Sequence, residues 1–366
     1  MLAAAELAAF LADDWRRQTR LFPQAISAQS WALAPDSLCQ LTESELVESR
    51  LVQADYEVIH GPFEFTEVPG QPLLGAGEML MVQCLEQHLT SVAAMIDEAF
   101  DFLPRWQIDD VMGSFGYDGA NCGAHFDQYD VFLVQLTGEK IWHLDGGQHE
   151  ESELDASADL RLLKTFSPSQ TLTARPGDVL YIPPGVGHHG ICLGESLTLS
   201  VGIRNPTTAE MLADLSEFAL EASAAVPLES KLHAATTRLP KEAGSQIAAM
   251  ASEVFSPDLV SRWYGCYVTR LRDPEVLTPG SAPASMLGRT LSASLPTRLS
   301  WQQTDAEDQA LRLFVNGDCY ELAAENIGWV RALCEKRQVR LPDRLTDDAE
   351  TVTAWLVDAG ALELDA

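Results

Sequence analysis

The chain has 366 residues, and its 46% apolar and 21% charged residues are typical of a folded globular protein with two or three domains. Its 54 acidic and 24 basic residues give a formal net charge of -30. A protein this acidic repels phosphate backbones, so direct nucleic-acid binding is not expected. The charge suits a basic protein partner, or it serves only to keep the chain in solution.

The first segment, "MLAAAELAAFLADDW", predicts an amphipathic helix over residues 1–15. Acidic residues interrupt its apolar run and the basic start of a signal peptide is missing, so export is not expected. No later window is apolar over the length of a membrane span, so no membrane partner is expected. The seven cysteines are scattered and never form a C-x-x-C pair, which argues against disulfides and Cys-ligated zinc and favours a reducing cytoplasm.

Up to about residue 205, short apolar runs rich in β-branched and aromatic residues predict strands, as in "DVFLVQL", "KIWHL", "DVLYIP" and "LTLSVGI". We expect a turn at "LTGEK" between the first two runs, and turns at "RPGDV" and "PPGVG" around "VLYI". Closely spaced strands with such turns predict an antiparallel barrel or jelly roll over residues 1–205.

The pattern changes after residue 205. "NPTTAEMLADLSEFALEASAA" has the start signals of a helix, with Glu210 after a pair of threonines, and "SPDLVSRWYGCYVTRL" continues the helical spacing. The segment "DPEVLTPGSAPASM" is typical of a linker. From residue 291 onward, "LRLFVNGDCYEL" predicts a hairpin that turns at Asn316-Gly317, followed by two short helices. We therefore expect a helical region over 206–290 and a small winged-helix-like module over 291–366.

Two motifs carry candidate metal ligands. His125 and Asp127 are two positions apart, so on a strand both side chains point to the same face. "GDVLYIPPGVGHHG" contains a Pro-x-Gly-x-x-His spacing that selects His188, with His189 as the alternative ligand. The two spacings resemble the metal-binding motifs of the cupin superfamily, in which the first pair lies on a strand beside the strand that ends at the later His.

Two imidazoles and one carboxylate on one side of a metal leave neighbouring coordination positions open, as in non-haem Fe(II) oxygenases. Zinc is the rival metal, and with only three protein ligands it would also be catalytic. Many Fe(II) oxygenases use 2-oxoglutarate, whose far carboxylate needs a cation. Lys140 lies inside the apolar run "GEKIWHL" and is the candidate, unless Glu139 or Asp145 pairs with it. Ser200 is a second candidate for the same carboxylate, or an ordinary strand residue.

"GAHFDQYDVFLVQLTGEKIW", "PGDVLYIPPGVGHHG" and "SVGIR" closely resemble the bacterial ribosomal oxygenases of the JmjC type. The resemblance extends through "ESRLV", "HGPF", "LPRWQIDDVMGSF" and "RWYGCY", covers most of residues 1–270 and is weak beyond them. It implies a mainly β JmjC/cupin double-stranded β-helix (a jelly roll) as catalytic domain, then a helical dimerisation region and a winged-helix-like domain.

The resemblance also implies the chemistry. Members are similar to Fe(II)- and 2-oxoglutarate-dependent hydroxylases that consume O2, and the bacterial branch hydroxylates the β-carbon of an arginine in large-subunit ribosomal protein sixteen. By position, the metal ligands are His125, Asp127 and His188, and the cosubstrate-binding residues are Lys140 and Ser200. A homodimer that acts on a basic loop of that ribosomal protein is implied. From their nearness in sequence to the ligands, Asp118, Tyr129 and Asp130 are candidates for touching the target guanidinium.

One loop departs from the family pattern. Where the family has a Gly-rich loop ending in Gly-Pro-His, this chain has "GYDGANCGAH", with Ala124 in place of Pro and with Asp118 and Asn121 among the glycines. The departure leaves the metal ligands intact and bears on substrate choice. The rival functions are a histidine hydroxylase or histone-type lysine demethylase on the same machinery, a zinc or iron cupin that does not use 2-oxoglutarate, and a non-catalytic cupin scaffold.

Overall fold

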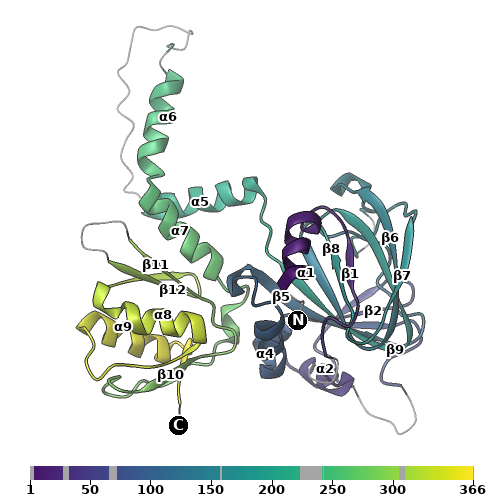
Figure 1. Cartoon of the computed structure of the whole chain (residues 1–366), viewed down its shortest axis with the longest axis horizontal. Helices are drawn as coiled ribbons and strands as arrows, with labels where there is room; N and C mark the ends of the chain where they lie inside the picture. The colour runs from purple at the N-terminus through teal and green to yellow at the C-terminus, as the bar shows by residue number, and fades with distance from the viewer. Residues whose placement is uncertain are drawn as a thin grey trace. The chain divides into compact units, whose positions relative to one another are not determined.

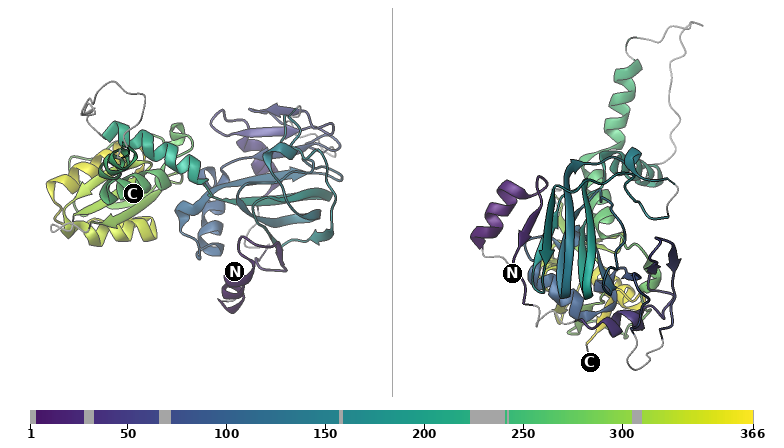
Figure 2. Two further views of the ribbon diagram at one scale, coloured as in Figure 1. Left: turned by 90° about the horizontal axis from the view of Figure 1, so that it is seen from above. Right: turned by 90° about the vertical axis from the view of Figure 1, so that its right-hand side faces the viewer.

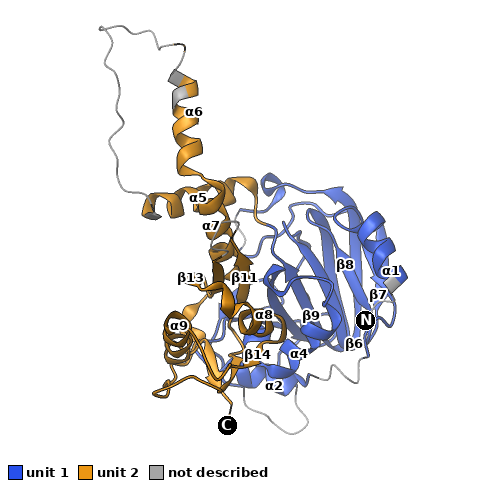
Figure 3. Ribbon diagram, turned by 60° about the vertical axis from the view of Figure 1, so that its left-hand side comes forward, with its two compact units in different colours: residues 1–205 blue, residues 206–366 orange. Residues whose placement is uncertain are grey.

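The structure of the chain, a computed structural model, describes residues 4–27, 33–65, 72–156, 159–222, 241, 243–304 and 310–365. The chain divides into two compact units, residues 1–205 and residues 206–366, which Figure 3 draws in blue and orange. Within the described ranges, no helix has both the length and the apolar character needed to cross a membrane.

The first unit is built on one antiparallel sheet, curled into the β-sandwich of a jelly roll as predicted (Figure 1). The strand order is β1-β8-β6-β9-β5-β4-β2-β3, with β7 paired to β6. The strands are β1 (Arg20–Phe22), β2 (Ser49–Val52), β3 (Val58–His60), β4 (Met79–Val82), β5 (Ile108–Gly116), β6 (Asp130–Gln148), β7 (Gln170–Ala174), β8 (Val179–Ile182) and β9 (Val186–Ile203). The helices are α1 (Ala4–Ala9), extended by a π-helical turn (Phe10–Asp14), α2 (Pro35–Leu41), α3 (Leu85–His88) and α4 (Thr90–Ala99). The predicted N-terminal helix is thus confirmed over residues 4–14.

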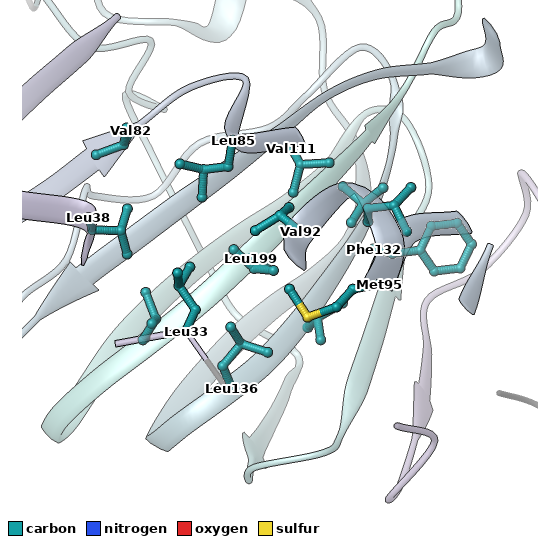
Figure 4. Packing of buried hydrophobic residues seen from close by; sticks show 14 of the residues in the cluster. Leu33, Leu38, Val82, Leu85, Val92, Met95, Val111, Phe132, Leu136 and Leu199 are labelled. Carbon is teal, nitrogen blue, oxygen red and sulfur yellow. The ribbon is translucent and has the colours of Figure 1, made fainter. Parts of the chain in front are cut away.

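The main core of this unit lies against one face of the sheet. Val92 and Met95 of α4 pack with Val111, Phe132 and Leu199 from three neighbouring strands (Figure 4). Because side chains alternate along a strand, the residues between these core positions point to the other face of the sheet. That other face lines the interior of the jelly roll.

Strands β6 and β9 are the longest pair and run side by side in antiparallel register from Asp130 opposite Ile203 to Gln148 opposite Val186 (Figure 2). The prediction of a turn at "LTGEK" is therefore wrong, because β6 continues through it. Register shifts follow Gln135 and Thr137, and Gly138 adopts a φ of 63°. A Cβ at Gly138 would lie 1.8 Å from the Glu195 carbonyl oxygen, so the close approach of the two strands requires glycine there.

The described residues of the second unit form three helices at its start, and then two small sheets whose strands alternate with two more helices. The helices are α5 (Thr208–Ala222), α6 (Ala243–Val254), α7 (Pro257–Thr269), α8 (Ile327–Lys336) and α9 (Asp347–Asp358). One sheet has the order β14-β10-β15 and the other β11-β12-β13. Their strands are β10 (Thr290–Ala293), β11 (Leu299–Gln303), β12 (Leu311–Val315), β13 (Asp318–Leu322), β14 (Gln338–Arg340) and β15 (Leu362–Leu364).

Two local predictions in this unit are confirmed. At the start of α5, the Thr207 N–H donates to Glu210 (2.7 Å) and the Glu210 N–H donates back to the Thr207 hydroxyl (3.2 Å), which is a capping box. Between β12 and β13, Asn316 and Gly317 have φ values of 54° and 100°, as a tight hairpin turn requires. The segment expected to be a linker packs against the module, since Met286 is fully buried in its core.

Candidate metal centre and cosubstrate pocket

The two halves of the predicted ligand set meet in the first unit. His125 and His188 exchange a pair of backbone hydrogen bonds, His125 N–H to His188 O (3.0 Å) and His188 N–H to His125 O (2.8 Å). The His188 Nε2 atom lies 3.6 Å from the Asp127 Oδ2 atom, and ligand atoms of all three side chains lie within 4.8 Å of one another. In the described ranges these three residues make up the one such cluster of His, Cys, Asp or Glu side chains.

The local elements differ from expectation in two respects. The H-x-D pair does not lie within a strand: His125 forms an isolated bridge to His188, and Asp127 lies in the short segment before β6. His188 is near the beginning of β9, whereas a strand ending at this residue was expected. The adjacency of the two motifs is confirmed, because the bridge joins them directly.

Both imidazoles are oriented for metal binding by backbone carbonyls. His125 Nδ1 lies 3.0 Å from the Gly123 oxygen, and His188 Nδ1 lies 3.0 Å from the Val186 oxygen. A carbonyl only accepts, so each Nδ1 carries the proton and each Nε2 keeps a lone pair. Burial, with a smaller contribution from the His125 ring, lowers the pKa of His188 to about 4, so this imidazole is neutral near pH 7.

His189 lies elsewhere. Its Nε2 atom is 3.0 Å from the Asn121 Oδ1 atom, and that oxygen also accepts from Tyr56 Oη (2.9 Å) and the Gly123 N–H (3.0 Å). The loop over 116–124 differs from the family pattern in its polar residues, and these residues make hydrogen bonds that hold the loop in place. Asp118 accepts a hydrogen bond from the Gly194 N–H (2.9 Å) in the same way.

A cavity of about 440 Å³ opens beside the three clustered side chains. Alternate residues of β5 face it, namely Asp110, Met112 and Ser114, while Val111 and Phe115 face the core. Its further lining residues come from β2, from β4 and the residue after it, from the segment between β5 and β6, from β6 and the loop after it, and from β9, and include Arg50, Met79, Met81, Gln83, Cys122, Tyr129, Trp142, Asp159, Leu160, Arg161, Leu162 and Gly190.

Lys140 is a buried cation in the wall of this cavity, with 2% of its surface exposed. Its ammonium donates to the Ser114 hydroxyl (3.2 Å), and no carboxylate of the described residues lies within 4.0 Å. Glu139 pairs with Arg175 (3.4 Å), and Asp145 pairs with His149 (2.6 Å), so neither of the two alternative partners takes this role. A buried ammonium without an anion is costly, so the site fits an anionic group that enters the cavity.

Trp142 strengthens that fit. It is two residues after Lys140 and also lines the cavity, with its ring centroid 5.4 Å from the Lys140 ammonium. Its buried indole N–H finds no hydrogen-bond acceptor among the described residues. A buried ammonium with no described carboxylate partner and an indole N–H with no described acceptor therefore belong to the same cavity wall, which suits a carboxylate.

The hydroxyl beside Lys140 comes from a residue that sequence reasoning missed. Ser200 lines the cavity as expected, but it lies opposite Met112, whereas Ser114 lies opposite Thr198 and reaches the ammonium. The alternation in "IDDVMGSFG" contains the signal, because it places Asp110, Met112 and Ser114 on one face. Only the sheet order places that face beside Lys140.

Of the three candidates for touching the target, the structure brings Tyr129 alone to the cavity. Burial, followed by the charges of Asp127 and Asp110, raises the pKa of the Tyr129 hydroxyl, which stays protonated. Asp130 is fully buried on the opposite face, where it accepts from Tyr181 Oη and from Arg16 Nε (3.1 Å). The lining carboxylates besides Asp127 are Asp110 and Asp159, and neither was singled out from the sequence.

Comparisons with known proteins agree with this geometry. A family model of the JmjC domain matches residues 95–211, and one of the ROXA-like winged helix matches residues 248–363. The chain is 30% identical over 283 residues to the ribosomal protein uL16 3-hydroxylase of Escherichia coli strain K12, which covers 75% of this chain and 74% of that protein.

Solved structures are similar over the whole chain. YcfD, a ribosomal oxygenase from Escherichia coli, matches with a TM-score of 0.78 and 26% identity over 98% of both chains. The same protein has been solved with cobalt and 2-oxoglutarate, again with a TM-score of 0.78 and 26% identity over 98% of both chains.

The fold and the clustered His, Asp and His side chains define a JmjC-type oxygenase with a ROXA-like winged helix. The chain belongs to the family of JmjC-type ribosomal oxygenases, as its sequence motifs predicted.

Proposed function

We propose that this chain hydroxylates the β-carbon of an arginine in ribosomal protein uL16 of the large subunit, with Fe(II), 2-oxoglutarate and O2. The general class is that of an Fe(II)- and 2-oxoglutarate-dependent ribosomal protein hydroxylase. The observation that supports it most is one cavity that contains both the three candidate metal ligands and an unpaired buried ammonium, in a chain 30% identical to a uL16 3-hydroxylase.

In this proposal His125, Asp127 and His188 bind the metal through two neutral imidazoles and one carboxylate. Such a set favours Fe(II) and leaves neighbouring positions open. When bound, the metal supplies the chemistry that activates dioxygen with 2-oxoglutarate. Lys140 holds the far carboxylate of 2-oxoglutarate with Ser114, and Ser200 contributes to the same wall. The protein's part is to place one C–H bond of the substrate beside the metal.

The remaining walls suit a long cationic side chain. Met79, Met81 and Met112 supply an apolar surface for methylene groups, and Asp110 and Tyr129 supply polar groups for a guanidinium. The net charge of -30 favours encounter with a basic ribosomal protein and disfavours direct binding to nucleic acid. Asp110 thereby takes the role that was expected of Asp118 and Asp130.

The organisation of the chain is part of the proposal. Residues 1–205 are the catalytic domain, residues 206–290 a helical dimerisation region and residues 291–366 a winged-helix-like domain. Exposed apolar residues on α5 and α6 support the dimer, because Leu212, Leu220 and Ile247 each expose more than half of their surface. A cytoplasmic location is supported by a ribosomal substrate and by seven scattered cysteines that never form a C-x-x-C pair.

The test uses purified protein with Fe(II), 2-oxoglutarate, air and a peptide that covers the arginine-containing loop of uL16. We expect the peptide to gain the mass of one oxygen atom only when 2-oxoglutarate is present, and fragmentation to place it on the arginine β-carbon. Succinate formation without a change in the peptide would reject the target and keep the enzyme class. Absence of both, with iron bound, would favour a cupin enzyme of another type or a scaffold.

A further inference from the structure

We propose that Asp145 and His149 form a clamp behind the metal centre that fixes the backbone carrying all three ligands. They are positioning residues, since neither side chain belongs to the ligand cluster. This inference rests on the proposed metal site and extends it to residues outside the cavity. Asp145 lies near the end of β6, and His149 follows that strand directly.

The orientation of the two ligand imidazoles depends on the position of the backbone. In many metal sites a carboxylate side chain orients the ligand imidazole through its second nitrogen. Here that role belongs to the carbonyls of Gly123 and Val186. The direction of each Nε2 lone pair therefore depends on where the main chain lies, and whatever fixes the main chain fixes the metal site.

Asp145 fixes the main chain beside His188. Its Oδ1 atom accepts from the Gly187 N–H (3.1 Å) and from the Gly147 N–H (3.3 Å). A Cβ on Gly187 would lie 2.6 Å from the Asp145 Oδ2 atom, so the carboxylate lies directly against the backbone that precedes the ligand.

His149 fixes the segment with the other two ligands. Its ring stacks on Phe126, which lies between His125 and Asp127, with centroids 5.9 Å apart and planes at 29°. The backbone N–H of His149 donates to the Gly185 carbonyl (2.8 Å), and the backbone N–H of Gly185 donates to the Asp127 carbonyl (2.7 Å). His149 thus contacts the H-x-D segment directly through its ring, and its backbone is linked to that segment through Gly185.

A hydrogen bond joins the two halves of the clamp. His149 Nε2 lies 2.6 Å from Asp145 Oδ2, and His149 Nδ1 bonds Glu153. Burial alone would lower the pKa of His149, but the bonds to Glu153 and Asp145 outweigh it and raise the pKa. The Asp145 and His149 side chains are largely buried, at 9% and 14% exposure, while Glu153 is exposed at 47%. The hydrogen bond between Asp145 and His149 therefore links the backbone beside His188 to the segment that contains His125 and Asp127.

The experiment measures Mn(II) binding to the metal-free full-length protein by calorimetric titration, with no substrate. Asp145→Ala and His149→Leu are expected to weaken Mn(II) binding by about 10- to 100-fold, as the loss of an outer-shell partner typically does. His149→Gln is expected to lose less, because its amide can still donate to Asp145. Melting temperatures of the metal-free variants are recorded alongside.

The matched control is His143→Gln on the same strand, where the half-buried imidazole lies 2.9 Å from the Thr171 hydroxyl. It is expected to bind Mn(II) as the unchanged protein does. Mn(II) affinities of Asp145→Ala and His149→Leu within twofold of the unchanged protein would overturn the clamp, as would losses that merely follow the melting temperature. Asp127→Ala separates the two hypotheses, because Mn(II) binding that survives it would reject the metal site itself.

Discussion

Among the described residues, each compact unit has one deeply buried Lys or Arg, and the two differ in what surrounds them. Arg312 in the second unit bonds the carboxylates of Asp258 (2.8 Å) and Glu321 (3.1 Å). Lys140 in the first unit has a hydroxyl partner and no described carboxylate within 4.0 Å. A cation paired by the chain itself stabilises the fold, whereas a cation left for an outside anion indicates a binding site.

Buried polar side chains give a second comparison between the two units. Asn326, which is buried in the second unit, bonds the Ala323 carbonyl, the Thr346 hydroxyl and the Trp329 indole. The Trp142 indole beside Lys140 finds no acceptor among the described residues. Asn326 is satisfied within the chain and supports a closed core, whereas the Trp142 indole N–H belongs to a residue that lines the cavity. The following changes test this comparison.

The largest effect is expected from Asp127→Ala. It removes the one carboxylate of the ligand cluster, so hydroxylation and 2-oxoglutarate turnover should fall by more than the ~100-fold that outer-shell losses cause. Succinate release and bound iron are the measurements. His189→Gln is the matched control and should retain iron, because His189 bonds Asn121 away from the cluster. Succinate release that survives Asp127→Ala would contradict the ligand set.

Lys140→Met should raise the 2-oxoglutarate requirement by about 10- to 100-fold, the equivalent of the ~1.5–3 kcal/mol of a hydrogen bond to a charged group. The substitution should leave the free energy of unfolding unchanged or raise it, because it removes a buried charge that has no carboxylate partner among the described residues. Titration of the Mn(II)-loaded protein with 2-oxoglutarate measures the affinity for the cosubstrate, and urea unfolding measures the free energy of unfolding. Lys140→Arg should restore part of the affinity. An unchanged requirement would show that Lys140 is only structural.

Gly190→Ala and Gly265→Ala form a matched pair across the two units. The added Cβ would lie 2.6 Å from the Trp142 ring in the first case and 2.3 Å from the Phe314 ring in the second. Each should destabilise its unit by about 1–3 kcal/mol through overpacking. Only Gly190→Ala should also weaken 2-oxoglutarate binding, because Trp142 lines the cavity. Equal effects of the two changes on that affinity would contradict the comparison.

The smallest effect is expected from Arg312→Met. Its two carboxylate partners are more than half exposed, so water replaces the guanidinium and the loss of stability should be about 1 kcal/mol. Urea unfolding measures the loss, and 2-oxoglutarate affinity should not change. A loss of affinity as large as that of Lys140→Met would show that the two buried cations are not distinct in role.

The sequence by itself determined the features that depend on short spacings. The motif spacings selected His125, Asp127 and His188, and the structure brings these three together, because an isolated bridge joins His125 directly to His188 and Asp127 is only two residues from His125. The capping box at Thr207 and Glu210 and the turn at Asn316-Gly317 were predictable for a similar reason, since each is a contact between residues at most three apart.

The tertiary structure decided which side chains share the cavity. Val131 and Leu133 line it before the register shifts in β6, and Lys140 and Trp142 line it after them, so the inward positions change from odd to even numbers. A bulge of one residue reverses which face a side chain takes, and the sequence pattern "LTGEK" looked instead like a turn. The pairing of β5 with β9, and of β9 with β6, brought Ser114 and Asp110 to the site and left Asp130 on the core face. Such pairings join residues that are distant along the chain, and no local pattern specifies them.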